Sequence, residues 1–426
     1  SILKDNSVKK SVRYLKYILG IVIFVLLSIG TFNWFIDPFE IYWTGEYKPH
    51  RKIFMKNFPT FKAMNVRKIV PQSLILGSSR SMIGLDAEHP GGDPSMSPRY
   101  NFGVPASNLY EILSYLEHSN ELNPIKQAIV GLDFFSFNIF YKANSQFNDS
   151  FLLKEGESQQ LSYFRETMIS LFTLTAFNMS KKKMRSAGKE NIFLNGSTTE
   201  FYKYTQKYPP GKSFLHNQKN YISVFLYPPP RYHFCMYDQN GENPQMKALK
   251  KIVNLANRKN IDLRIFIHPI HASLQQIIKY AGLWEEFEDW KKNLVQITSK
   301  QTLDQNQKIK LWDFSGYNDF TTEDKTPVES LVPTMKWYWE AMHYNNKLGD
   351  RVLDRIYNYK DDSRNTPDNF GVLINKENIA SHIMLVRKQQ MKYELSHAKE
   401  KEIWLQRIEQ IKVKRRSSDC HMGSGA

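Results

Sequence analysis

The chain has 426 residues, of which 41% are hydrophobic and 14% aromatic, so it can form one large α/β domain with additions or two modest domains. Disorder is not the expected state of most of the chain. The formal net charge of +16 suits an anionic partner such as a phospholipid surface, an acidic glycan or a nucleic acid. No zinc-finger or RNA-recognition motif occurs, so we expect no nucleic-acid partner.

Residues 17–36 contain no charged side chain and are mostly large aliphatics, so this run of roughly 20 residues is long enough to cross a membrane. Basic side chains precede the run and acidic ones follow it: Lys4, Lys9, Lys10, Arg13 and Lys16 before, and Asp37, Glu40 and Glu46 after. The positive-inside rule therefore predicts a cytoplasmic tail (1–16), a transmembrane anchor (17–36) and a periplasmic or extracellular remainder. Trp34, Tyr42 and Trp43 stand where an aromatic belt meets the outer headgroups.

Two other interpretations of this segment are a cleaved signal peptide and a buried core helix. A signal peptide has a shorter apolar region and small residues at its cleavage site, whereas Phe32, Trp34 and Phe35 occupy the end of this run. The lopsided flanking charge disfavours a core helix. The anchor is the favoured interpretation.

After the anchor, short apolar runs alternate with helical patterns. The predicted strands are 73–76, 100–102, 128–132, 261–267 and 308–312. The predicted helices are one that Ser107 caps and that runs to about 118, and those at 245–257, 274–299 and 346–357. Continuous apolar strands in alternation with helices predict an α/β fold with a parallel sheet covered on both faces.

The alternation divides the chain into parts. We expect the α/β domain in two pieces, 37–140 and 244–360, around an inserted cap or subdomain at 141–243. A basic helical extension follows at 361–416, with one or two amphipathic helices between 379 and 413 that either contact lipid or a partner or present a solvated charged face. Residues 417–426 are typical of an appended tail. The two cysteines, Cys235 and Cys420, are too few for a disulfide framework and match no metal-ligand spacing.

The predicted strands end in polar residues that are candidates for chemistry. Gly77-Ser78-Ser79-Arg80 follows the first strand and precedes a helix, where backbone N–H groups stabilise a developing oxyanion. The alternative is a serine-rich turn or phosphate loop. Glu340 stands three residues before His343, a spacing that lets a carboxylate orient the imidazole that takes a serine proton. The alternative there is an exposed glutamate beside a packed histidine.

His268 and His271 follow another strand. They lack a third ligand at a recognisable spacing, so we expect no metal and no cofactor, with His268 lining a pocket or serving a structural role.

Together these motifs resemble the SGNH (GDSL-like) hydrolase and acyltransferase superfamily. The resemblance implies a flavodoxin-like parallel sheet, with Ser79 as the nucleophile of the Gly-Asp-Ser-like block and Glu340 and His343 matching Asp-x-x-His. Asn101-Phe102-Gly103 matches the block whose glycine N–H serves the oxyanion hole. The third block offers an asparagine in the family, but Asp133 stands here.

An ionised Asp133 would repel an oxyanion, so it must be protonated, turned away or serving another role. Asn108 and Asn138 are possible substitutes for the missing donor. We place Arg80, Asn101, Asp133 and His268 around the substrate or oxyanion.

The anchor and the outward-facing domain are similar to proteins that transfer D-alanine to teichoic acids or acetylate exopolysaccharides such as alginate. The resemblance implies a membrane-bound O-acyltransferase as partner and a polysaccharide as acceptor. The expected function is a serine O-acyltransferase of the cell envelope, in which Ser79 attacks, His343 is the base, Glu340 orients it and the N–H groups of Ser79 and Gly103 hold the oxyanion. The alternatives are an esterase with the same site and a non-enzymatic scaffold that binds an acidic polymer or a membrane partner.

Overall fold

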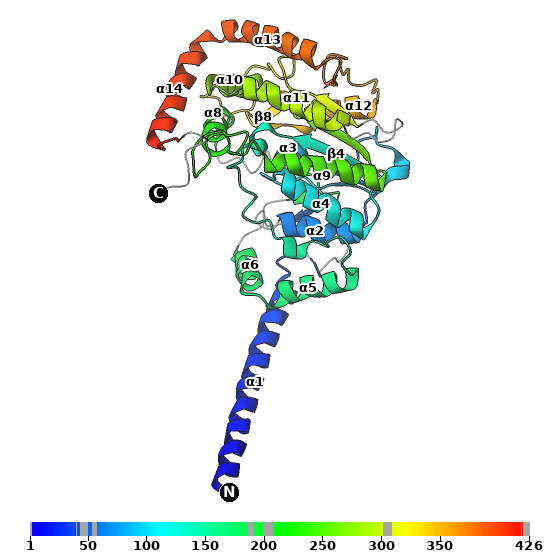
Figure 1. Ribbon diagram of the computed structural model, residues 1–426, viewed down its shortest axis with the longest axis vertical. Coiled ribbons are helices and arrows are strands. Elements are labelled where there is room, and N and C mark those ends of the chain that lie inside the picture. The colour runs from blue at the N-terminus through cyan, green and yellow to red at the C-terminus, as the bar shows by residue number, and fades with distance from the viewer. Residues whose placement is uncertain are drawn as a thin grey trace.

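The computed structural model describes residues 2–39, 41–42, 50–52, 58–185, 191–193, 195–198, 208–300, 309–418 and 420 (Figure 1). Some positions named above lie outside the described residues: Glu40, Trp43, Glu46, the first position of the predicted strand 308–312, and residues 421–426. The structure is an α/β domain with one long helix projecting from it.

A six-stranded sheet forms the centre of the domain. Its strands are β2 (Ser73–Leu76), β3 (Arg99–Asn101), β4 (Gln127–Leu132), β6 (Asp262–Ile267), β7 (Lys310–Asp313) and β10 (Val372–Leu373). Their order is β10-β7-β6-β4-β2-β3, and all neighbours are parallel except β10, which pairs antiparallel with β7. The five predicted strands are confirmed, whereas β10 was not predicted because two residues carry no periodicity.

Helices cover both faces of the sheet. Alternate strand residues point to opposite sides, so Leu74 and Leu76 lie in one hydrophobic core and Ile75 lies in the other. The first core includes residues of α4 (Leu109–Leu122), α9 (Pro244–Lys259), α10 (Ala272–Tyr280) and α11 (Trp284–Lys300). The second core includes residues of α12 (Asn346–Tyr357). The carboxyl ends of the parallel strands are thereby left as the open edge for a site.

Two local predictions were wrong. The predicted helix 274–299 is two helices, α10 and α11, separated at Gly282, whose φ of +79° favours glycine. The N-cap of α4 is Asn108 rather than Ser107, and it forms a capping box with Glu111. The Ser107 hydroxyl instead donates to the Gly77 carbonyl at 2.9 Å.

The N-terminal helix α1 (Ile2–Ile36) stands almost clear of the domain (Figure 1). Within the described residues, its segment Lys10–Ile36 is the one helix long and apolar enough to cross a membrane, and a signal sequence satisfies the same criterion. The expected long apolar helix is therefore confirmed.

Between β4 and α9 the chain leaves the sheet. This segment contains the helices α5 (Gln159–Phe172), α6 (Leu174–Arg185) and α8 (Pro210–Asn220), the π-helix η5 (Tyr221–Leu226), and β5 (Asn191–Phe193), which pairs antiparallel with β1 (His50–Lys52). The remaining elements near the sheet are α2 (Phe58–Ile69), α3 (Ser79–Gly84), β8 (Tyr338–Glu340), β9 (His343–Tyr344) and the 3-10 turns η2 (Pro94–Met96), η3 (Phe134–Phe137) and η4 (Asp149–Phe151).

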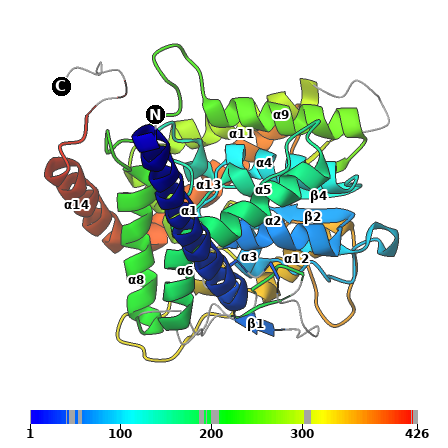
Figure 2. The same cartoon turned by 90° about the horizontal axis from the view of Figure 1, so that it is seen from below.

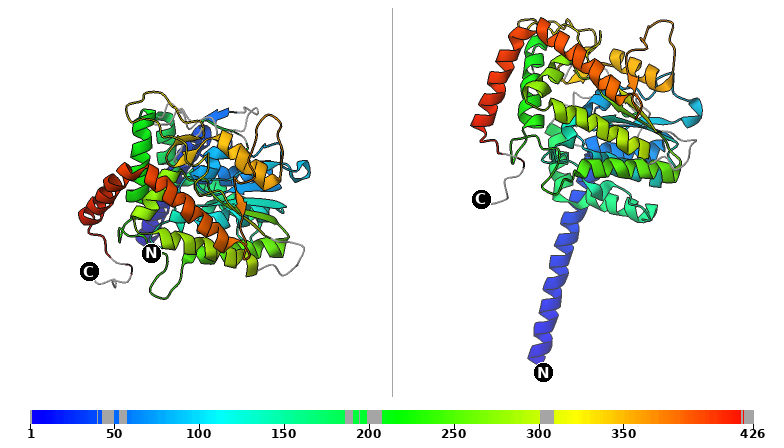
Figure 3. Two further views of the ribbon diagram at one scale, coloured as in Figure 1. Left: turned by 90° about the horizontal axis from the view of Figure 1, so that it is seen from above. Right: turned by 45° about the horizontal axis from the view of Figure 1, so that its top comes forward.

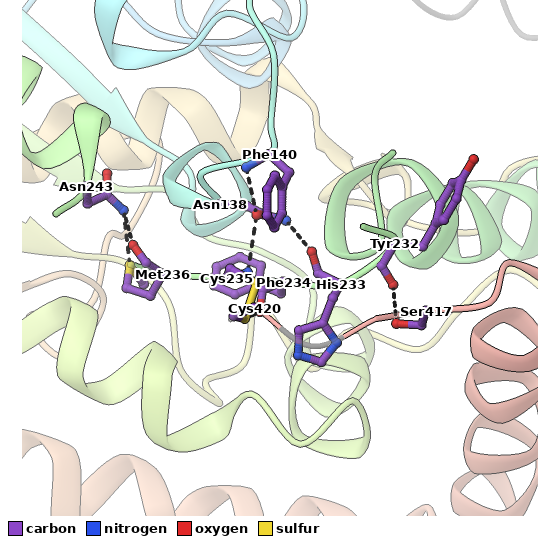
Figure 4. Close-up of a disulfide and its surroundings, with 10 residues drawn as sticks. All are labelled: Asn138, Phe140, Tyr232, His233, Phe234, Cys235, Met236, Asn243, Ser417 and Cys420. Atoms are coloured by element: carbon purple, nitrogen blue, oxygen red, sulfur yellow. Dashed lines mark hydrogen bonds between the residues drawn. A yellow bond between two sulfur atoms is a disulfide. The ribbon is translucent and has the colours of Figure 1, made fainter. Parts of the chain in front are cut away.

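Two C-terminal helices, α13 (Ile379–Ser396) and α14 (Ala398–Lys414), follow the sheet. Figure 3 shows α13 along the end of the domain opposite α1. Beyond α14, Cys420 forms a disulfide with Cys235 of the inserted segment, as Figure 4 shows. The Ser417 hydroxyl also donates to the Tyr232 carbonyl at 2.7 Å. The chain after α14 is therefore tied to the insertion, a pairing that two cysteines 185 positions apart gave no reason to expect.

Candidate active site

The turn between β2 and α3 positions Ser79. Gly77 has a φ of +144°, and a Cβ there would lie 2.3 Å from Ser81 Oγ, so only glycine fits this turn. Ser78 is the N-cap of α3, and its hydroxyl accepts from the Arg80 N–H at 3.2 Å. Ser79 is thus the first residue of the helix, partly exposed at the carboxyl edge of the sheet.

The short hairpin of β8 and β9 brings Glu340 and His343 to the same edge. His343 Nε2 lies 2.8 Å from Ser79 Oγ, although the two residues are 264 positions apart. The other ring nitrogen, Nδ1, is hydrogen-bonded to Glu340 Oε1. Glu340 Oε2 accepts from the Met342 N–H at 2.7 Å, and the side chain is buried. The structure therefore brings Ser79, His343 and Glu340 into one hydrogen-bonded chain.

This chain has the polarity that nucleophilic catalysis needs. A carboxylate only accepts hydrogen bonds. In the neutral form of the imidazole that fits this contact, the proton is on Nδ1, and this N–H donates a hydrogen bond to Glu340. Nε2 is then an acceptor facing the Ser79 hydroxyl. Such a histidine can take the serine proton as the hydroxyl attacks, while the carboxylate stabilises the imidazolium that forms.

Asp133 forms a buried ion pair with Arg80. Arg80 Nη1 contacts Asp133 Oδ1, and each side chain is only 3% exposed. Burial is the largest single influence and raises the pKa of Asp133, but the Arg80 guanidinium, His268 and the Ser78 hydroxyl together outweigh it and hold the pKa below its ordinary value. Asp133 is therefore ionised and paired, which is a role that an asparagine could not fill.

Arg80 also connects the two halves of the site. Its Nε donates to the Met342 carbonyl at 2.7 Å, one residue before His343. Because Arg80 follows Ser79 directly, one side chain ties the serine turn to the histidine hairpin and to the end of β4. The sequence placed Arg80 near the substrate, but it gave no signal for this pairing with a residue 53 positions away.

Asn101 and Gly103 hold the serine helix from the adjacent strand. Asn101 Nδ2 donates to the carbonyls of Ser81 and Leu85 at 2.9 and 2.8 Å. The Gly103 N–H donates to Asn101 Oδ1 at 2.9 Å, so this expected oxyanion donor already has an acceptor. A Cβ on Gly103 would lie 2.6 Å from the Met82 nitrogen, so the close approach of α3 leaves room only for glycine at this position.

The two asparagines considered as further donors serve the local structure. Asn108 Oδ1 accepts from the Glu111 N–H at 3.0 Å as part of the α4 cap. Asn138 Nδ2 donates to the His233 carbonyl at 3.1 Å, next to the disulfide (Figure 4). Neither amide is directed at Ser79 by these bonds.

Lys62 is a buried residue of this region that the sequence did not indicate. Its Nζ donates to the carbonyls of Asn101 and Gly103 at 2.9 and 2.5 Å, so it clamps the loop after β3. Burial lowers the pKa of Lys62 well below its ordinary value. No pattern would have found it, since a single lysine in an amphipathic helix is usually solvent-exposed.

His268 is buried against Gly131 of β4 and beside Tyr344. Its Nδ1 is 3.0 Å from the Tyr344 hydroxyl, and its ring packs where a Cβ on Gly131 would lie 2.4 Å from Nε2. Burial lowers the pKa of His268 to about 4, so the ring is neutral. Among the described residues, no acceptor or donor pairs with His268 Nε2 or with Arg80 Nη2.

The second histidine of that motif has a separate role. His271 Nε2 contacts the Glu323 carbonyl at 2.8 Å, and Nδ1 accepts from the Ser273 N–H at the start of α10. These bonds leave His271 no lone pair for a metal shared with His268. His233, Cys235 and Cys420 also lie together, but the two sulfur atoms are joined to each other.

Comparison of the chain with models of protein families and with curated proteins finds no match. The function is therefore inferred from the chemistry of the site itself.

Proposed function

We propose that this protein is a membrane-anchored serine O-acyltransferase of the SGNH type that works outside the cytoplasm. The observation that carries the proposal is the hydrogen-bonded chain from Ser79 through His343 to Glu340. The sheet supports it: numbered along the chain, the five parallel strands have the order 2-1-3-4-5 of flavodoxin-like folds, with Ser79 after the first. The uncharged run 17–36 of the apolar helix Lys10–Ile36, together with the basic residues that precede this run, supports the anchor.

The reaction has two acyl transfers. Ser79 Oγ attacks the carbonyl carbon of an activated acyl donor as its proton passes to His343 Nε2, and that proton then leaves with the donor's leaving group. An acceptor hydroxyl next attacks the acyl-serine and gives its proton to His343 Nε2. The bond to Ser79 Oγ breaks, and the serine regains that proton. Atoms and charge balance with no cofactor.

The oxyanion needs donors next to Ser79. We assign the Ser79 N–H, at the first position of α3. The Gly103 N–H can join only if Asn101 Oδ1 releases it. Arg80 Nη2 is a buried donor without an acceptor among the described residues, so it is the second donor that we assign to the substrate.

The burial of His343, the proposed base, favours transfer over hydrolysis. His343 and Glu340 are both buried. An active site from which water is excluded gives a bound acceptor hydroxyl the advantage over water. The resemblance adds a membrane-bound O-acyltransferase as the acyl supplier and a cell-envelope polysaccharide as the acceptor.

A fluorophosphonate probe tests the proposal, because it reacts only with an activated serine. The wild type should be labelled and Ser79→Ala should not. Ser78→Ala is the matched control: it removes the adjacent hydroxyl, which caps α3, and should retain labelling. Undiminished labelling of Ser79→Ala would refute the proposal. Without an acceptor, a transferase should accumulate acyl-enzyme from an activated ester, whereas an esterase should turn over.

A further inference from the structure

Helix α5 has its polar side turned toward the protein. Its buried positions are Ser162, Glu166 and Ser170, which recur every four residues along one face. Ser162 and Glu166 accept from Arg67 of α2 at 2.8 and 2.7 Å. The inner face of α5 is therefore attached by hydrogen bonds and an ion pair.

The outer side of α5 is apolar. Leu161 is 66% exposed and Phe164 is 62% exposed. The partly exposed Met168 and Leu171 continue the same stripe at helical spacing, and Leu174, the first residue of α6, is 74% exposed. A helix on a water-facing surface shows the opposite arrangement, with its apolar stripe inward. The inverted arrangement indicates an apolar environment outside the helix.

The junction of α5 and α6 is joined to the end of α1. A Cβ on Gly30 would lie 2.6 Å from the Phe172 ring, so the two helices approach closely there. Asn33 is buried: it donates to the Leu171 carbonyl at 2.7 Å and accepts from Ser180 Oγ at 2.8 Å. The single polar amide in this part of α1 is thus satisfied by the helix pair.

The position of this junction places it at membrane depth. Gly30 lies six residues before the end of α1 at Ile36, which is about 9 Å along the helix axis. The uncharged run 17–36 spans a hydrocarbon core of about 30 Å, so the outer boundary falls near Ile36. Phe172 therefore lies below that boundary. Figures 1 and 2 show α5 and α6 beside the point where α1 joins the domain.

The end of α6 is basic. Lys181, Lys182 and Arg185 are exposed, while Lys183 donates to the Asp37 carbonyl at 2.7 Å just after α1. Asp37 follows the end of α1, so these basic side chains lie near the outer boundary of the hydrocarbon core. Lysine and arginine beside an apolar surface at that boundary meet the phosphates of a lipid headgroup layer.

We propose that α5 and α6, residues 159–185, form a foot that lies in the headgroup and upper acyl region of the membrane leaflet facing the catalytic domain. Its occupant is the lipid of that leaflet, with anionic headgroups at the basic end of α6. The inference depends on α1 being the anchor and is independent of the catalytic proposal. The foot fixes the tilt of the domain over the membrane, because α1 and α2 both hold it.

Lipid-attached quenchers test the foot in the full chain reconstituted into vesicles of phosphatidylcholine and phosphatidylglycerol. A polarity-sensitive fluorophore is placed on Leu174→Cys in the foot. The matched control is Leu395→Cys on α13, a leucine 81% exposed at the opposite end of the domain. A third probe on Phe24→Cys, in the middle of α1, reports insertion of the anchor.

The foot predicts strong quenching at positions 174 and 24 by lipids carrying a nitroxide on the acyl chain, and little at 395. Quenching of the probe at position 24 without quenching at position 174 would contradict the proposal for the foot, while still supporting insertion of α1 as the anchor. Loss of quenching at 24 overturns both. A blue-shifted but unquenched probe at 174 indicates that a protein, either a second copy or a partner, covers this surface, which also overturns the lipid assignment.

Discussion

Replacing Asp133 by asparagine tests whether the buried ion pair supports the site. The variant leaves Arg80, which is 3% exposed, without its counter-charge, and neutralisation is not an escape because the pKa of arginine is already far above neutral. Breaking one partner of a buried pair typically lowers the free energy of unfolding by 3–5 kcal/mol. The asparagine oxygen can still accept from Arg80, so we expect about 3 kcal/mol.

The assay is guanidinium unfolding of the full chain in detergent, followed by near-ultraviolet circular dichroism. A paired variant, Arg80→Met with Asp133→Leu, removes both charges and should recover most of the lost stability. The same paired variant also loses the bond from Arg80 Nε to the Met342 carbonyl, so its fluorophosphonate labelling should stay slow. An Asp133→Asn protein that unfolds at the wild-type denaturant concentration would contradict the buried pair.

Three further predictions concern the triad, the disulfide and a buried acid. Glu340→Gln should slow serine labelling on the order of 10⁴-fold, measured by stopped-flow, because the carboxylate accepts from both the Met342 N–H and His343 and an amide oxygen cannot do both. Cys235→Ser should expose one maleimide-reactive thiol without reduction and lower the free energy of unfolding by about 2–4 kcal/mol; two free thiols in the unreduced wild type would contradict the bridge. Burial raises the pKa of Glu111 to about 7 from an unfolded value of 4.5. The folded state therefore binds the proton more tightly, and the free energy of unfolding falls by about 3 kcal/mol as the pH rises from about 4.5 through 7. Glu111→Gln should remove this dependence in melting curves at about pH 5 and about pH 8, and an unchanged dependence would show that another group causes it.

The strands and most helices were predictable because their hydrophobic patterns are local. The run Leu74 to Leu76 is apolar on both sides, as a strand between two helical layers must be. The break at Gly282 was missed because the apolar periodicity continues through α10 and α11, and a single glycine does not distinguish a kink from an end.

The candidate catalytic residues were predictable in type, but their surroundings were not. Ser79 and His343 stand in motifs whose spacing has a chemical reason, and the structure places them 2.8 Å apart. The partners of Asp133 and of buried Lys62 are set by tertiary packing between segments distant in the chain. Sequence alone left three roles open for Asp133, since nothing local identifies Arg80 as its partner.

Peptide mass mapping after brief exposure to p-nitrophenyl acetate locates the acyl group and so tests whether Ser79 is the nucleophile. We expect one acetyl group on the peptide that contains Ser79, and none on that peptide in His343→Ala, which lacks the imidazole 2.8 Å from the hydroxyl. Acetylation of Ser79 that persists unchanged in His343→Ala, or that occurs only at other residues, would contradict this expectation.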